Sequence, residues 1–181
     1  MRRILAVSLL ITLVALAGCG SSGSSSSSSG SPGSGGAAQT SGAGHTSLAK
    51  TKFVFHAGLA FGAFHRYIYK PLKNHAFTGA GGLRKASILI KGALAAAFTY
   101  HELKLAAHDA QSSPTLRKLV SPLTALATRI QGLGPGIRRG QASSSEVDGA
   151  NSQISTIGSH SKQAGQPINE RNPPASLQPV S

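Results

Sequence analysis

The sequence is poor in cysteine, acidic residues and aromatic residues, and each shortage narrows what the protein can be. Its 181 residues include one cysteine, no tryptophan, and five Asp or Glu against 18 Lys or Arg. The single cysteine, Cys19, has no disulfide partner within the chain. Because carboxylates are scarce, most cations cannot be neutralised by internal ion pairs. With no recognition motif and no interleaved aromatic platform, we do not expect nucleic-acid binding.

The apolar run near the N-terminus is too short to cross a membrane. It extends from Ile4 to Leu16, is interrupted only by Ser8 and Thr12, and follows two arginines at positions 2 and 3. These thirteen residues fall short of the roughly 20 that a spanning helix needs. A positive start, a short apolar core and small residues after it are typical of an export signal that is removed.

The apolar run ends in Leu16-Ala17-Gly18-Cys19. This segment resembles the lipobox of bacterial lipoproteins, in which an aliphatic residue, a small residue and Gly or Ala precede the cysteine. The resemblance covers residues 1–19 and implies that residues 1–18 are a lipoprotein signal peptide. Cys19 would then become the new N-terminus and carry fatty acyl chains through a diacylglycerol on its thiol. The other interpretation is an ordinary secretory signal followed by an unrelated cysteine.

A lipidated Cys19 would hold the protein on a membrane without spanning it. Each buried CH2 group contributes about 0.8 kcal/mol, so two or three acyl chains give a stable anchor. The resemblance therefore implies a lipid-anchored protein of the cell membrane, outside the cytoplasm. In a cell with two membranes the outer membrane is also a possible location, because Gly20 is not the aspartate associated with retention in the inner membrane.

Residues 19–47 are expected to be a disordered linker that begins with the lipidated cysteine. After Cys19 the segment is almost wholly Ser, Gly, Ala and Thr and has no charged residue. Such a composition cannot bury enough apolar surface to offset chain entropy. As a flexible coil it would reach roughly 30 Å from the membrane anchor.

The rest of the chain predicts an all-α fold, a small antiparallel bundle of three to four helices. Residues 48–160 are expected to form a basic helical domain. Residues 161–181 have several prolines and no apolar period, so they are expected to form a loose disordered tail. Helical spacing of apolar residues predicts helices over 48–70, 83–110, 113–132 and 144–159. Since each apolar face needs another to cover it, the helices are expected to pack together.

Prolines, glycines and serines set the expected helix boundaries. Pro71 is expected to stop the first helix, because it supplies no amide donor. Ser113 is expected to cap the third helix, which ends at Gly132 and Gly134. At Pro122 this helix is expected either to kink or to restart with Ser121 as a second cap. Ser143, followed three residues later by Glu, resembles a capping box for the fourth helix. Small residues are expected to allow close helix approach at Gly58, Gly62, Gly92 and Ala96.

The positive charge lies in the helical domain. Residues 48–140 contain 14 Lys or Arg and only two acids, Glu102 and Asp109, which gives this segment a formal charge of +12. Outside a cytoplasm the partners for such a charge are anionic lipid and cell-wall polymers. The alternative, of equal weight, is that the cations are simply the solvated face of an Ala-rich bundle.

Histidines are the candidates for metal binding. Three imidazoles with Glu102 or Asp109 would suit zinc or a similar metal. However, His101-Glu102 lacks the second histidine of a zinc-protease helix, since Leu105 stands in its place. We therefore expect no metal site and no cofactor, and keep four histidines as weak candidates: His56, His65, His101 and His108.

A glycine-rich turn, Thr78–Gly82, leads into Leu83-Arg84-Lys85 and invites comparison with a phosphate-binding loop. It lacks the Gly-Lys-Ser/Thr ending and a preceding strand, so we interpret it as an interhelical loop. No catalytic set emerges elsewhere, and we expect no enzyme. The sequence thus predicts a membrane-anchored, surface-exposed lipoprotein with an envelope interaction or structural role. The alternative is a metal- or small-ligand-binding lipoprotein that uses the histidines of its first two helices.

Overall fold

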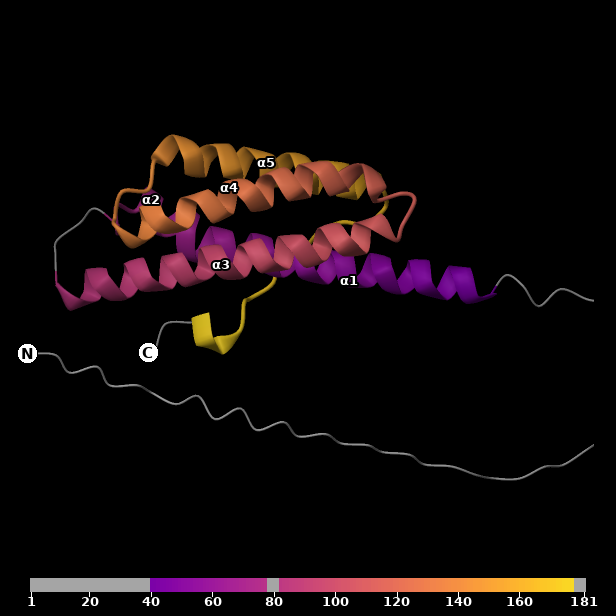
Figure 1. The fold of residues 1–181 in the computed structure, drawn as a ribbon, viewed down its shortest axis with the longest axis horizontal. Coiled ribbons are helices and arrows are strands. Elements are labelled where there is room, and N and C mark those ends of the chain that lie inside the picture. Colours follow the sequence, from indigo (N-terminus) through magenta and orange to yellow (C-terminus); the bar gives the residue numbers. More distant parts are fainter. Residues whose placement is uncertain (1–39, 78–81, 178–181) are drawn as a thin grey trace, which may run out of the picture. The chain divides into compact units, whose positions relative to one another are not determined.

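The computed structural model describes residues 40–77 and 82–177, and these residues form an antiparallel helical bundle without strands (Figure 1). This confirms the all-α prediction. The four long helices are α1 (Thr40–Phe64), α3 (Leu83–Gln111), α4 (Val120–Arg138) and α5 (Ser144–Gln163). Shorter elements are the π-helical turn η1 (His65–Tyr69), α2 (Lys70–Lys73), and the 3-10 turns η2 (Arg117–Leu119) and η3 (Ala175–Leu177).

Helix α3 is the centre of the bundle, because it packs against α1 on one side and α4 on the other, while α5 covers α4. Its predicted bounds are confirmed to within one residue. Small and large side chains alternate in the core, where alanines of α1 and α3 lie beside Phe53, Phe64 and Leu103, all fully buried. The predicted apolar stripe of the third helix is buried at these positions: Leu116, Leu119, Leu123, Leu126, Ala127 and Ile130.

The first helix begins at Thr40, within the predicted linker, and does not stop at Pro71. Its helical path continues to Lys73 through the π-helical turn η1, in which the Lys70 N–H donates to the His65 carbonyl five residues back. A proline inside a helix lacks an N–H donor and crowds the carbonyl of the preceding turn. The wider turn directly before Pro71 lets the chain stay helical at that point.

Helix α4 begins close to the restart expected at Ser121 and Pro122 rather than at Ser113, and it ends later than predicted. Ser113 makes no helix cap: its hydroxyl bonds to the Thr115 hydroxyl at 3.1 Å, and α4 begins at Val120. The helix then passes through both glycines that were expected to end it and stops at Arg138. Leu133 and Ile137 explain the extension, because they continue the apolar stripe and are buried. Core packing outweighs the low helix propensity of glycine.

Glycine allows close approach between α3 and α4, as the sequence predicted at Gly92. A Cβ atom there would lie 2.8 Å from Ile137 Cγ2 and 3.2 Å from Phe77 Cζ. Helix α5 begins where predicted, at Ser144, and runs four residues longer. Its N-cap, Ser143, forms no capping-box bond and contacts the Ser145 hydroxyl instead.

Residues 164–177, here called the C-terminal segment, pack against the bundle, unlike the expected loose tail: Asn169 and Arg171 lie on α1, and η3 contacts α3. The Arg171 N–H donates to the Gly58 carbonyl at 2.9 Å. A Cβ atom at Gly58 would overlap the Asn169 carbonyl oxygen, and one at Gly62 would overlap that of Arg171. Leu177 joins the hydrophobic core. Gly58 and Gly62 therefore allow close contact with the backbone of the C-terminal segment, rather than with a second helix as expected.

Candidate functional site

The predicted lipidation site, Cys19, lies outside the described residues, as do the signal peptide and most of the linker. Within residues 40–77 and 82–177, no helix is both long and apolar enough to cross a bilayer. The described domain offers three kinds of candidate site: its histidines, its cations and its pockets.

His56 lies between two carboxylates of α3. Its Nδ1 is 2.6 Å from Glu102 Oε2, and its Nε2 is 3.9 Å from Asp109 Oδ2. The Glu102 side chain is 9% exposed, so the imidazole satisfies a carboxylate that is nearly buried. A buried carboxylate without a hydrogen-bond donor is costly, and this contact joins α1 to α3. We assign His56 a structural role.

His65 holds the C-terminal segment against the bundle. Its Nδ1 is 2.6 Å from Glu170 Oε1, and its Nε2 is 2.7 Å from Asn151 Oδ1. An imidazole that faces two oxygen acceptors with both nitrogens bridges α5 and the C-terminal segment. Next to it, Arg66 donates to Asn172 Oδ1 at 3.1 Å.

The four candidate histidines do not converge on one site. His101 is exposed on α3, and His108 is exposed beside Asp109, with Nδ1 3.9 Å from Oδ1. His56 contacts Glu102 and Asp109 on α3, whereas His65 contacts Asn151 on α5 and Glu170 in the C-terminal segment. Among the described residues, no group of three or more His, Cys, Asp or Glu side chains is arranged to hold a metal ion.

Because histidines occupy most of the carboxylates, few Lys or Arg side chains of the described residues have an acidic partner. Glu102, Asp109 and Glu170 face histidines. In the part of the chain that the structure describes, one Lys or Arg side chain makes an ion pair with a carboxylate: Lys73, 2.8 Å from Asp148. The hydrogen bond from Lys73 to Asp148 raises the pKa of this amine above its ordinary value of 10.5.

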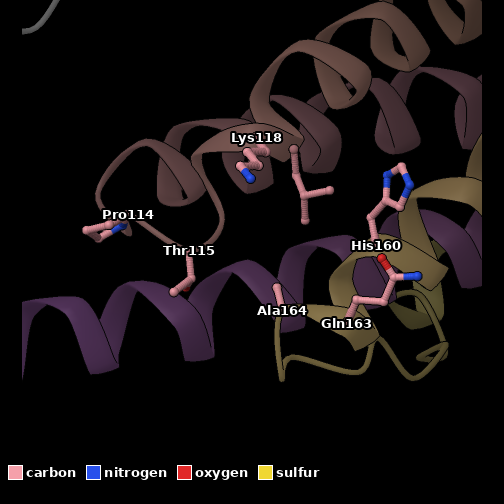
Figure 2. Close-up of a pocket in the computed structure, with 7 residues that line it drawn as sticks. Pro114, Thr115, Lys118, His160, Gln163 and Ala164 are labelled. Carbon is pink, nitrogen blue, oxygen red and sulfur yellow. The ribbon is translucent and has the colours of Figure 1, made fainter.

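One pocket, of about 720 Å3, opens where the connection between α3 and α4 meets the end of α5 (Figure 2). Lys118 lies on one side, and His160 and Gln163 on the other. The remaining lining residues are Pro114, Thr115, Leu119 and Ala164. The lining contains no carboxylate or cysteine and no nucleophile paired with a base, so it does not form a catalytic set.

A second pocket, of about 520 Å3, is more strongly charged. It lies between η1, α2 and the first turns of α3, and its charged lining residues are Arg66, Arg84 and Lys91. The lining is completed by Tyr67, Pro71, Ser87 and Ile88. The glycine-rich turn indicated Arg84 as part of a possible anion site. The pocket itself could not be predicted from the sequence, because Arg66 comes from a different helix and no local pattern connects the two.

Comparison with known proteins gives no relative: no protein-family model, curated protein or solved structure matches the chain.

Proposed function

We propose that this protein is a membrane-anchored, surface-exposed lipoprotein whose basic helical domain binds anionic components of the cell envelope without catalysing a reaction. The observation that carries the proposal is the excess of cations without acidic partners. Once Arg2 and Arg3 are set aside, 16 Lys or Arg remain against five acids, a formal charge of +11. Three of those acids face histidines rather than Lys or Arg.

The anchor supports the same proposal from the other end of the chain. The lipobox-like segment Leu16–Cys19 would place acyl chains at the start of the mature protein. A cation near an anionic membrane surface contributes about 1 kcal/mol, and this attraction decays over a Debye length of about 8–10 Å. A tether keeps the basic domain near the surface, so weak contacts act at a high effective concentration.

The anchor is tested by Cys19→Ser in the native host. We expect the variant to lose labelled fatty acid and to leave the membrane fraction. Ser21→Ala should keep both properties because it leaves the lipobox-like segment intact. The double variant Cys19→Ser/Ser21→Cys restores a thiol two residues too late and should stay unlabelled. Undiminished labelling and membrane fractionation of Cys19→Ser would overturn the proposed anchor.

The basic domain is tested by retention of envelope material. Immobilised Cys19→Ser protein should bind anionic lipid or wall polymer from an envelope extract at low salt and release it at high salt, because screening weakens contacts between exposed charges. Retention that does not change with salt, or no retention of anionic material, would contradict an electrostatic role. Metal analysis of the same preparation checks the expectation that no metal is bound.

A further inference from the structure

The pocket between η1, α2 and α3, here called the basic pocket, contains the groups that a phosphate requires. Arg66 and Arg84 supply guanidinium groups, which can form bidentate hydrogen bonds with phosphate oxygens, and Lys91 supplies an ammonium group. Ser87 adds a hydroxyl. No carboxylate is among its described lining residues, so these cations are not neutralised within the pocket.

Tyr67 adds an unpartnered hydroxyl next to the basic pocket. Its side chain lines the basic pocket, the residue is only 7% exposed, and its hydroxyl is buried with no hydrogen-bond partner among the described residues. An unsatisfied buried hydroxyl is costly unless a ligand completes its hydrogen bonding. A phosphate oxygen is an acceptor that a phenol hydroxyl can satisfy.

The start of α3 strengthens the positive field. The helix is 29 residues long and begins at Leu83 beside the basic pocket. Its N-cap residue is Gly82, so no side chain caps the N-terminus of the helix. The positive end of the helix dipole favours an anion at this end. Arg84 lies in this first turn, and Ser87 and Lys91 follow on the same face at helical spacing.

An exposed apolar stripe on α3 lies beside the basic pocket. Leu83 is 92% exposed, Ile90 58% and Leu94 52%, at spacings of seven and four that put them on one helix face. Ser87 and Lys91 of the basic pocket border this stripe on the helix surface. Large exposed apolar side chains next to cations are typical of surfaces that lie in a lipid interface.

We propose that the basic pocket binds the phosphate of an anionic phospholipid headgroup while Leu83, Ile90 and Leu94 enter the interfacial layer. The apolar stripe favours a lipid over a soluble phosphate, because a soluble anion leaves those side chains in water. This inference deepens the proposed function and rests on it, since it requires the domain to meet a membrane surface.

Binding is measured first with the full chain in a non-ionic detergent, titrated with short-chain phosphatidylglycerol, short-chain phosphatidylcholine or inorganic phosphate. We expect phosphatidylglycerol to bind more tightly than the other two. Arg84→Gln/Lys91→Gln should weaken this binding about tenfold, since it removes charge-assisted hydrogen bonds. The control Arg117→Gln/Lys118→Gln removes the same charge at the opposite end of α3 and should leave binding nearly unchanged. An equal loss of affinity in both double variants would show that net charge alone accounts for it, and would overturn the proposal that the basic pocket binds the headgroup.

Tyr67→Phe separates binding from folding. It removes only the hydroxyl, so we expect binding about threefold weaker and a stability equal to or above that of the native chain. Unchanged binding would remove Tyr67 from the site.

Lipid entry is measured with Leu83→Trp, which is a clean reporter because the chain has no tryptophan. In nanodiscs that contain phosphatidylglycerol, its emission should shift to the blue, whereas phosphatidylcholine alone should give no shift. Ala125→Trp, at an exposed position of α4, should not shift in either. Inorganic phosphate binding as tight as the lipid, without a blue shift, would assign the pocket to a soluble anion.

The detergent titration does not depend on an acyl chain at Cys19. Failure of the anchor and failure of the basic pocket are therefore distinguishable: the first appears in fatty-acid labelling, the second in the comparison of the two double variants.

Discussion

Gly62→Ala should release the C-terminal segment from α1. The backbone of Arg171 crosses the helix at this glycine, and an added Cβ would overlap its carbonyl oxygen and lie 3.0 Å from its carbonyl carbon. Both helix and segment present backbone here, so neither can yield by rotating a side chain. The added methyl group therefore displaces the segment, together with the Arg171–Gly58 hydrogen bond and buried Leu177.

The expected loss of stability is about 2 kcal/mol. Exposing a buried leucine costs about 2 kcal/mol, and losing a backbone hydrogen bond costs about 1 kcal/mol. Alanine is the better helix former and returns about 1 kcal/mol. For a unit of this size, with an unfolding entropy of roughly 0.3 kcal/mol/K, the midpoint of thermal unfolding should fall by about 7 °C.

The change is measured by thermal unfolding and by trypsin cleavage after Arg171, which detachment should accelerate. Gly132→Ala is the matched control, because this glycine is also helical and a Cβ there meets nothing within 4 Å. The control should gain up to about 1 kcal/mol of stability. If Gly62→Ala were as stable and as resistant to trypsin as this control, the packing of the segment on α1 would be refuted.

Two further predictions concern polar contacts between helices. His56→Ala should lower the free energy of unfolding by about 2 kcal/mol, because it leaves nearly buried Glu102 without its donor. In the same urea unfolding experiment the control His101→Ala, at an exposed position, should stay within about 0.5 kcal/mol of the native chain. Equal effects of the two substitutions would contradict the structural role of His56. Lys73→Met should lose the stabilising contact with Asp148. Because the folded-state pKa of Lys73 is raised above 10.5, the native chain should be more stable than the variant below that pH, and this difference in stability should vanish as the pH rises through the raised pKa. A difference that persists above the raised pKa would exclude the ion pair as its cause.

Much of the fold could be predicted from local sequence. The apolar spacing of 83–110 predicted α3 almost to the residue, and the start of α5 at Ser144 followed from the serine before it. Predictions from single prolines and glycines failed where packing competed with them. Pro71 did not end a helix because a π-helical turn precedes it, and Gly132 did not because buried side chains follow.

The basic pocket was harder to predict from the sequence than the fold. The glycine-rich turn before Arg84 suggested an anion, yet the turn lacked the phosphate-loop pattern. Arg66 belongs to η1 and Lys91 to the third turn of α3, so their meeting at one pocket depends on how two helices pack. The histidine contacts show the same dependence on packing. His56 contacts Glu102 on α3 and His65 contacts Glu170 in the C-terminal segment, and no local pattern indicates either pairing.

By itself the sequence determined the helical class, the helix-forming segments and the excess of positive charge, because periodicity and composition act locally or additively along the chain. It also supplied the lipobox-like segment on which the anchor proposal depends. Only the tertiary structure decided which carboxylates the histidines occupy, which cations share a pocket, and that two glycines of α1 hold the C-terminal segment. Those outcomes depend on contacts between residues far apart in sequence, where packing geometry rather than local preference sets the lowest free energy.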